Sequence, residues 1–184
     1  GGHADPRKLM HLAFYAPMKP PDHPVPSGDR AIARALQAAL SYAGAKVEVA
    51  SQFRSRDGVG DPKVQDRMMA DAEAALPELI KRGAAAGWSA WLTYHNYYKA
   101  PDLLGSAVSE ALRIPYILIE ATRARKRLAG PWATFAQAAE NASDQANAIF
   151  YFSTRDAEAL ERDAPKGQVL VHLHPFLQRP DLPE

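Results

Sequence analysis

Residues 93–99 bring together the side chains of this sequence that are best suited to chemistry. The segment reads Thr-Tyr-His-Asn-Tyr-Tyr-Lys, which places one imidazole, one amide, three phenols and one ammonium within seven residues. His95, Asn96 and Lys99 can supply directional hydrogen bonds, and the ring of Tyr97 can pack on the C–H face of a sugar. This mixture suits sugar hydroxyls and phosphate groups. The alternative is that the tyrosines only cover the edge of a sheet.

A carboxylate and a basic run follow the most apolar strand predicted for the chain. Glu120 ends that strand, where a carboxylate costs free energy unless it is paired or faces a cleft. Glu120 is therefore a candidate acid or base, and the alternative is an ion pair with Arg123. Arg123 opens the only dense basic run, with four cations in five residues. The run can bind an acceptor phosphate or an anionic membrane surface, and a solvated loop is the alternative.

The segment before the first predicted helix can bind an anion. Backbone N–H groups of residues 27–30 lie at the positive end of the helix dipole, where Gly28 permits close approach and Arg30 adds donors. The candidate substrate-binding residues here are Ser27, Gly28, Asp29 and Arg30. The same sequence is also an ordinary helix cap. It contains neither a GxGxxG pattern nor a P-loop, so the usual support for a dinucleotide or ATP site is missing.

Other kinds of site have little support. The chain has no cysteine, which excludes a disulfide scaffold, a Cys-ligated zinc or iron–sulfur site and a thiol nucleophile. His172 and His174 point to one side of a predicted strand, but two ligands are too few, so we expect no metal site. No Gly-x-Ser-x-Gly elbow occurs, and a hydrolase triad therefore has little support.

Size and composition indicate one folded domain. The chain has 184 residues, of which 47% are hydrophobic and 23% are charged, as in an average globular protein. Its formal net charge of +1 argues against a nucleic-acid-binding protein that depends on a large uniform field. No window approaches the ~18 apolar residues of a membrane span, and residues 1–7 lack the pattern of a signal peptide. We therefore expect a cytoplasmic protein that does not bind nucleic acid.

Short apolar runs alternate along the chain with segments of helical periodicity. The runs predict strands over 9–16, 46–51, 88–94, 114–121, 148–153 and 168–174. The periodic segments predict helices over 30–43, 64–82, 101–112, 131–146 and 154–162. Pro62 fits the start of the second helix, Pro77 a kink or break, and Gly83 its cap, while Thr154 caps the last helix.

This alternation predicts an α/β fold, a doubly wound parallel sheet of about six strands with helices on both faces. In such folds ligands bind beyond the carboxyl ends of the strands, at the point where the strand order reverses. The loops that begin at residues 17, 52, 95, 122 and 175 are therefore expected to share one rim.

Six segments follow one another in an order that is typical of one enzyme family. They read LAFYAP, SGDRAIARALQAALSYAGAKVEVAS, TYH, IPYILIEAT, ANAIFYFSTRDAEAL and QVLVHLHPFL. Together they resemble the amino-terminal half of a GT-B glycosyltransferase, most closely the large retaining group known as family 4 or group 1. The match runs from Leu9 to about Leu177. The order of the segments is more specific than any one of them.

The resemblance implies a Rossmann-like, acceptor-side GT-B domain over residues 9–177. A disordered or tag-derived start over 1–8 precedes it, and a linker over 178–184 leads toward a carboxyl-terminal donor-binding domain that this sequence does not contain. The implied reaction moves a sugar, as a hexosyltransferase does, from a nucleotide-sugar donor to a small molecule or glycan. The donor is a substrate, so no cofactor is expected. We expect this chain alone to be nearly inactive and the full protein to be cytoplasmic, with contact to the inner face of the cell membrane as a further expectation.

The resemblance also implies which residues face the cleft. The expected catalytic residues are His95 and Glu120, and Glu120 stands near the position where many members have a strand-end histidine. The expected substrate-binding residues are Ser27, Gly28, Asp29, Arg30, Asn96, Tyr97, Lys99 and Arg123. Two other functions stay open. One is a GT-B nucleotide-sugar epimerase, which needs no acceptor, and the other is a stand-alone sugar- or nucleotide-binding module.

Overall fold

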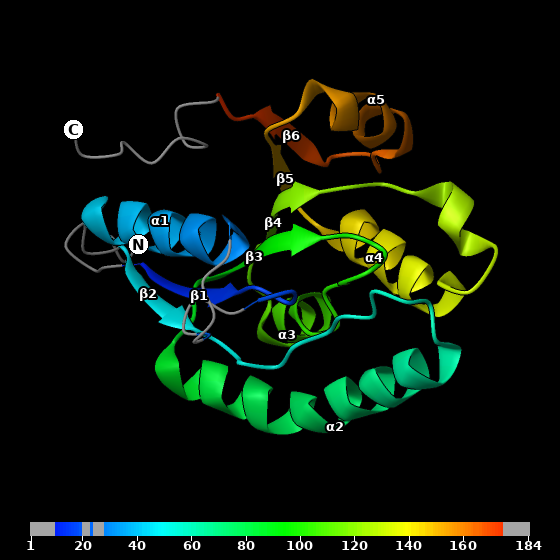
Figure 1. Cartoon of the computed structure of the whole chain (residues 1–184). Helices are drawn as coiled ribbons and strands as arrows, with labels where there is room; N and C mark the ends of the chain where they lie inside the picture. The colour runs from blue at the N-terminus through cyan, green and yellow to red at the C-terminus, as the bar shows by residue number, and fades with distance from the viewer. Residues whose placement is uncertain (1–9, 20–22, 24–27, 175–184) are drawn as a thin grey trace.

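A computed structural model describes residues 10–19, 23 and 28–174 of the chain. Within them six strands form one parallel sheet in the order β2-β1-β3-β4-β5-β6 (Figure 1). The strands are β1 (His11–Tyr15), β2 (Lys46–Val49), β3 (Ala90–Asn96), β4 (Tyr116–Ala121), β5 (Ala148–Tyr151) and β6 (Val169–His172). The helices are α1 (Gly28–Tyr42), α2 (Pro62–Ala86), α3 (Gly105–Leu112), α4 (Ala133–Gln145) and α5 (Thr154–Asp163), with a 3-10 turn η1 (Arg125–Leu128). The predicted doubly wound α/β fold is confirmed.

Helices cover both faces of the sheet (Figure 1). On one face α1 packs Ala33 and Leu36 into a core that contains Phe14 of β1. On the other face α2, α3 and α4 pack together, and their core also contains Leu160 of α5 and Tyr15 of β1. Neighbouring residues of β1 thus serve opposite cores, as the pleat of a strand requires. None of the helices in the described ranges is long and apolar enough to cross a membrane.

The long helix α2 begins where the sequence indicated. Asp61 caps it by accepting a hydrogen bond from the backbone N–H of Lys63 at 3.0 Å, and Pro62 is its first residue. Pro at this position loses no hydrogen bond, because the first N–H groups of a helix have no partner within it. The helix continues through Pro77 without interruption, so the alternative of a break at that residue is wrong.

The end of α2 differs from the prediction for a steric reason. Gly83 was expected to cap the helix, but it lies inside it, and Gly87 with a φ of 72° is the residue that ends it. Gly83 is needed because a Cβ there would meet Cε3 of Trp88 and would lie 2.8 Å from Cδ1 of Leu112. The glycine therefore marks a close approach of α2 to the core.

Two further boundaries differ from the prediction. β3 continues to Asn96, so His95 and Asn96 belong to the strand and not to the loop after it. Thr154 is the first residue of α5, and the cap is Ser153, whose Oγ accepts a hydrogen bond from the backbone N–H of Arg155 at 3.1 Å. Both shifts move polar groups closer to the carboxyl edge of the sheet.

A buried carboxylate holds the connection between β3 and α3. Asp102 is 4% exposed and accepts hydrogen bonds from Oγ1 of Thr93 and the hydroxyl of Tyr116, both at 2.5 Å. The backbone N–H groups of Leu104 and Gly105 donate to it at 3.0 and 2.9 Å. Burial and the charge of Asp102 raise the pKa of Tyr116, so this phenol keeps its proton and donates. Four donors offset the cost of burying the carboxylate.

Replacing Gly83 by alanine is expected to lower the free energy of unfolding by ~1–3 kcal/mol, because the added methyl group overpacks the contact with Trp88. Chemical denaturation followed by tryptophan fluorescence measures this change. The control is Ala84→Gly on the exposed side of the same turn. Its expected loss is only about 1 kcal/mol from helix propensity. A Gly83→Ala protein as stable as the wild type, or more stable, would show that the core yields to the methyl group.

Candidate functional site

Three of the sequence-predicted residues meet at the carboxyl edge of the sheet. The strand order reverses between β1 and β3, which is the usual position of a ligand site in this class of fold. Asp29 lies in the first turn of α1, His95 near the end of β3 and Glu120 near the end of β4. The fold therefore brings together side chains that are far apart in the sequence.

His95 and Glu120 share an unusual backbone conformation. Their φ angles are 69° and 64°, in the left-handed region that residues other than glycine rarely occupy. Tyr94 pairs with Ile119 and Asn96 pairs with Ala121, so His95 and Glu120 lie side by side on adjacent strands. Such a conformation costs free energy and persists only where the surrounding structure enforces it, which occurs often at functional sites.

Two contacts connect these residues to α1. Nδ1 of His95 lies 3.6 Å from Oδ1 of Asp29, and the two side chains are 16% and 28% exposed. The hydroxyl of Tyr94 lies 3.0 Å from Oε2 of Glu120 and 3.4 Å from Oδ1 of Asp29. The phenol thus bridges two carboxylates, and one of these carboxylates faces the imidazole.

The electrostatics of the cluster keep Asp29 charged. The imidazole of His95 is the largest influence and lowers the pKa of Asp29, although burial acts against it. At 3.6 Å the contact between the two side chains is longer than a hydrogen bond. The hydrogen bond from Tyr94 and the positive charge of Arg56 lower it further. A charged carboxylate beside one ring nitrogen of His95 can orient the imidazole.

Two members of the cluster were missed by the sequence analysis. Burial, with the charges of Glu120 and Asp29, raises the pKa of Tyr94, so its hydroxyl remains a donor. Burial also raises the pKa of Asp156, while a hydrogen bond from Thr122 and the charge of His95 lower it. Asp156 lies in the first turn of α5, just beyond β5. Its position after a strand end was a usable signal, because all such positions share one rim.

A row of aromatic rings leads away from His95 along residues 97–99. The imidazole stacks on Tyr97 with ring centroids 4.5 Å apart and planes at 10°. Tyr97 meets Tyr98 edge to face at 5.7 Å, and Tyr98 meets Trp132 in the same manner at 5.5 Å. Nζ of Lys99 lies 5.4 Å from the centroid of Trp132. Tyr97 and Tyr98 are partly exposed. Tyr97 stacks on His95, and Lys99 follows two residues later, so both belong to the segment beside this candidate catalytic residue.

Asn96 has a packing role in place of the expected contact with substrate. Its side chain is fully buried, and Oδ1 accepts a hydrogen bond from the backbone N–H of Asp102 at 2.9 Å. Nδ2 donates to the carbonyl of Ala139 at 3.0 Å and to Oγ of Ser143 at 3.1 Å. These bonds join β3 to α4 and leave no amide group for a ligand.

Arg123 is also used within the fold. Its side chain is 2% exposed, and Nη1 lies 2.8 Å from Oε2 of Glu140 and 2.7 Å from Oδ1 of Asp144. The alternative of an ion pair between Arg123 and Glu120 is therefore wrong, since Glu120 contacts Tyr94. The guanidinium anchors the segment after β4 to α4, which explains why it is not free to bind substrate.

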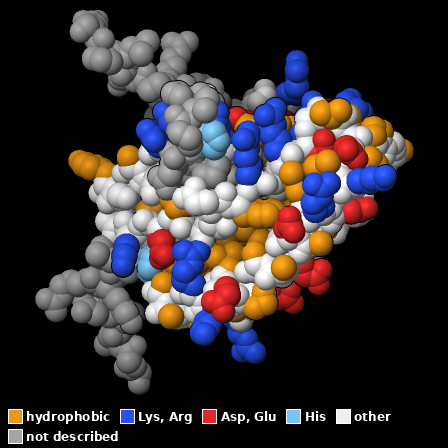
Figure 2. Space-filling view, turned by 60° about the horizontal axis from the view of Figure 1, so that its bottom comes forward, with side chains coloured by type: hydrophobic (Ala, Val, Ile, Leu, Met, Phe, Trp, Pro, Cys, Tyr) orange, Lys and Arg blue, Asp and Glu red, His pale blue; other side chains and the backbone are white. Residues whose placement is uncertain are grey.

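Arg125, the next cation of the basic run, is also paired. Nη2 of Arg125 lies 2.7 Å from Oδ1 of Asp163, which also pairs with Arg162. Charges of both signs are likewise mixed on the face drawn in Figure 2, where they surround a hollow in which hydrophobic side chains gather. The predicted solvated loop therefore describes the exposed Arg125 and Lys126 but not Arg123, whose side chain is buried.

The residues described at the start of α1 do not test the predicted phosphate contact, which stays a prediction. Ser27 lies outside the described residues. Gly28 is the first residue of α1, and a Cβ there would meet no atom within 4 Å. Nη1 of Arg30 donates a hydrogen bond to the carbonyl of His23 at 2.7 Å. Asp29 is the residue of this segment that reaches the cluster.

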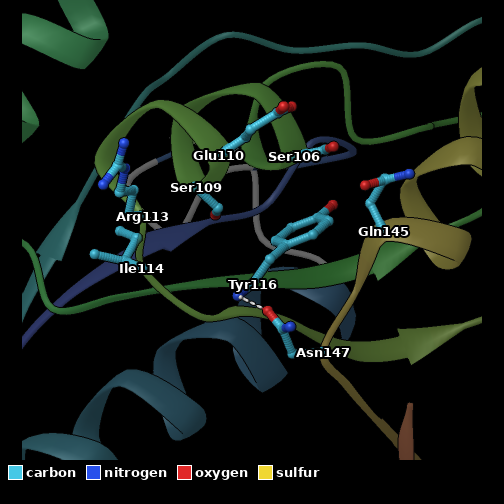
Figure 3. Close-up of a pocket in the computed structure, with 8 residues that line it drawn as sticks. All are labelled: Ser106, Ser109, Glu110, Arg113, Ile114, Tyr116, Gln145 and Asn147. Carbon is cyan, nitrogen blue, oxygen red and sulfur yellow. Dashed lines mark hydrogen bonds between the residues drawn. The ribbon is translucent and has the colours of Figure 1, made fainter. Parts of the chain in front are cut away.

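A pocket lies at the opposite edge of the sheet from this cluster, between α3 and the starts of β4 and β5 (Figure 3). Its volume is about 220 Å³, and its lining includes Ser109, Arg113, Tyr116, Gln145 and Asn147. Oδ1 of Asn147 accepts a hydrogen bond from the backbone N–H of Tyr116 at 2.8 Å, and Oγ of Ser109 is buried without a partner among the described residues. No sequence-predicted site residue lines this pocket.

The cluster at the carboxyl edge can move a proton. His95 supplies a titratable nitrogen, Asp29 supports it, and the Tyr94 hydroxyl remains a neutral donor. Within the described ranges no three His, Asp or Glu side chains come together as metal ligands. The side chains of this cluster can thus support general acid–base chemistry.

Comparisons with known proteins give weak structural similarity. A UDP-glucosyltransferase from Polygonum tinctorium that glucosylates indoxyl, solved with 3,4-dichloroaniline, is 12% identical with a TM-score of 0.46, over 90% of this chain and 51% of that one. UGT73P12 from Glycyrrhiza uralensis, solved with glycyrrhetinic acid 3-O-monoglucuronide, is 9% identical with a TM-score of 0.47, over 89% and 48%. The chain thus spans about half the length of each structure. At this level of similarity neither structure assigns a function to the chain. No protein-family model and no curated protein matches the sequence.

Replacing His95 by alanine is expected to raise the pKa of Asp29 toward its ordinary 3.8, because the strongest interaction that lowers it is lost. Since this pKa is lower in the folded state, Asp29 contributes stability that is present above about pH 4 and is lost as the pH falls through the folded value. Carbon-13 NMR titration of the carboxyl group measures the shift. Asp163, whose pKa is lowered by Arg162, is an internal control that should not move. An unchanged titration of Asp29 would contradict the contact.

Replacing Arg123 by alanine is expected to lower the free energy of unfolding by ~3–5 kcal/mol, because it leaves the carboxylate of Glu140 buried and unpaired. Denaturant unfolding measures the loss, and the exposed Lys126→Ala, with a change of ~0.5 kcal/mol or less, is the control. Adding Glu140→Ala to Arg123→Ala should restore part of the stability. Additive losses in the double variant would show that the two side chains are not coupled.

Proposed function

We propose that this chain is the acceptor-side domain of a glycosyltransferase that moves a sugar from a nucleotide-sugar donor to a hydroxyl group. The observation that carries the proposal is the pair of His95 and Asp29, with Nδ1 and Oδ1 3.6 Å apart, at the point where the strand order reverses. A base with a carboxylate behind it is the arrangement that activates a hydroxyl nucleophile. The proposal of a nucleotide-sugar donor comes from the order of the sequence segments, which resembles that of GT-B glycosyltransferases.

His95 is the proposed general base. Asp29 faces Nδ1, which leaves Nε2 to accept the proton of the acceptor hydroxyl. As this proton moves to Nε2, the acceptor oxygen bonds to the anomeric carbon of the donor sugar, and the bond from that carbon to the phosphate oxygen breaks. This single displacement inverts the anomeric carbon, in contrast to the retaining outcome that the sequence resemblance implies. The nucleoside diphosphate takes the electron pair of the broken bond and leaves. The charge of Asp29 stabilises the imidazolium that forms.

Glu120 and Tyr94 are proposed to position the substrate. One oxygen of Glu120 accepts the hydrogen bond from Tyr94, and the other has no partner among the described residues. This second oxygen of Glu120 can accept a hydrogen bond from a sugar hydroxyl. Tyr97, which stacks on His95, offers an aromatic ring against which the sugar can pack. Lys99 and the backbone of Gly28 complete the proposed substrate contacts at the same edge.

A second domain is part of the proposal. The sequence resemblance places the donor pocket largely in a carboxyl-terminal domain, which would close over this edge, exclude water and complete the reacting centre. We propose accordingly that this chain alone is nearly inactive, and that the full protein acts in the cytoplasm. The left-handed backbone of both His95 and Glu120 supports a functional site at this edge, because backbone strain clusters at active sites and ligand clamps.

The test is His95→Ala in the protein that carries this domain together with its donor-binding partner. Transfer from a set of radiolabelled nucleotide sugars is measured by product formation. Turnover should fall at least about tenfold, as expected for the loss of a general base, while the circular dichroism spectrum stays unchanged. His174→Ala is the matched control, because His174 is an exposed histidine beyond β6.

The outcomes separate the proposed function from its alternatives. Unchanged turnover in His95→Ala would remove His95 from the chemistry. Conversion of the donor without any acceptor would indicate an epimerase. Binding of the nucleotide sugar with no turnover in the wild-type protein would favour a binding module.

A further inference from the structure

We propose that Lys99 and Arg127 form a subsite for a phosphate group beside the candidate catalytic residues. The two cations come from different segments, the connection after β3 and the turn η1, and they share one pair of aromatic rings. The inference rests on the proposed function for the identity of the molecule that carries the phosphate. The geometry of the subsite stands without it.

The rings of Tyr98 and Trp132 form the base of the subsite. They meet edge to face, with centroids 5.5 Å apart and planes at 86°. Nζ of Lys99 lies 5.9 Å from the centroid of Tyr98 and 5.4 Å from that of Trp132. Cζ of Arg127 lies 4.8 and 5.5 Å from the same centroids. Both cations are within the ~6 Å at which a ring face attracts a positive charge.

Trp132 is itself fixed in place. Its Nε1 donates a hydrogen bond to the backbone carbonyl of Asp57 at 2.8 Å. The backbone N–H of Asp57 in turn donates to the carbonyl of Lys99 at 2.9 Å. The loop before α2 therefore ties the tryptophan to the segment that carries Lys99.

Lys99 and Arg127 differ from the neighbouring arginines in having no acidic partner. Arg123 pairs with Glu140, and Arg125 pairs with Asp163. Among the described residues no carboxylate lies within ion-pair distance of Lys99 or Arg127. Nε of Arg127 is in addition buried without a hydrogen-bond partner there. Two like charges on one pair of rings leave a net positive potential that an anion would neutralise.

A phosphate group fits this pair better than a carboxylate. A phosphate monoester carries close to two negative charges and three acceptor oxygens, which match one ammonium and one guanidinium fork. A carboxylate carries a single charge and would leave the second cation unneutralised. The stack from His95 through Tyr97 to Tyr98 connects the subsite to the proposed base, so a phosphate bound here belongs to a molecule whose other end reaches His95.

Two sources can present such a phosphate. One is a soluble phosphorylated acceptor or nucleotide, and the other is the headgroup of a lipid. The recognition chemistry is the same in both, but only the lipid places the rest of the ligand in a membrane. The experiment therefore has one arm for each source.

The first arm is isothermal titration calorimetry with inorganic pyrophosphate at low ionic strength, on the wild type and on Lys99→Gln, Arg127→Gln and Lys126→Gln. Lys126 is the matched control, an exposed cation beside Arg127 that contacts no ring. Each of the first two substitutions should weaken binding about tenfold, as expected for the loss of a charged hydrogen bond, and the control should not. The same affinity in all four proteins, or an equal loss in Lys126→Gln, would overturn the subsite.

The second arm is co-sedimentation with phosphatidylcholine vesicles that do or do not contain phosphatidic acid, whose headgroup is a phosphate monoester. Binding to the anionic vesicles that is lost in Lys99→Gln and Arg127→Gln, and kept in Lys126→Gln, supports the subsite and identifies a lipid headgroup as its ligand. Binding to pyrophosphate but not to vesicles supports a soluble ligand. Binding to neither probe overturns the proposal.

Failure of the subsite and failure of the proposed function give different results. The titration needs no turnover, so a protein without transferase activity can still show binding that depends on Lys99 and Arg127. Conversely, transfer that depends on His95, in a protein whose binding of pyrophosphate depends on neither Lys99 nor Arg127, would leave His95 as the base and remove the subsite.

Discussion

The carboxylate of Asp102 is the interaction on which the site depends most. It is almost fully buried and accepts four hydrogen bonds, from two strands and from the first residues around α3. Asn96 extends this network to α4 through its own amide. Residues 97–101 therefore leave β3 and return to the core between two fixed points. Because the aromatic and basic side chains of this segment start from a fixed backbone, the row of rings beside His95 can keep a defined shape.

The same network explains how the chain keeps two residues in a strained conformation. A left-handed backbone costs roughly 1–3 kcal/mol at each non-glycine residue. His95 and Glu120 adopt it side by side, between paired residues on both sides of each. The ladder of β3 and β4 and the buried amide of Asn96 hold the strand end in register, so the strain is confined to the residues that project toward α1. The strain is thus held between paired residues in the centre of the sheet.

The sequence was sufficient for the fold and for the position of the site, but not for the direction of each side chain. Apolar runs and helical periodicity are local signals, and they predicted the strands, the parallel sheet and the common rim that holds Asp29, His95 and Glu120. These local signals could not predict the role of Asn96. In regular alternation it would share a face with Tyr94, yet Tyr94 packs on the α1 face and Asn96 bonds to α4. The left-handed residue between them changes the face, and nothing in the pattern of residue types marks such a residue. Arg123 escaped prediction for a related reason, because its carboxylate partners lie on a helix that begins ten residues later.

The division of labour along β3 limits where this protein can diversify. Thr93 and Asn96 belong to the buried network, and Tyr94 and His95 to the carboxyl-edge cluster, so four consecutive residues are each committed to a task. At most of these positions, a substitution that changes which ligand is bound would also disturb the packing of the core. Variation that changes specificity without loss of the fold is therefore directed to the flanking surface segments, the 97–99 connection and the turn η1. We therefore expect related proteins to keep these residues of β3 and to vary the 97–99 connection and the turn η1.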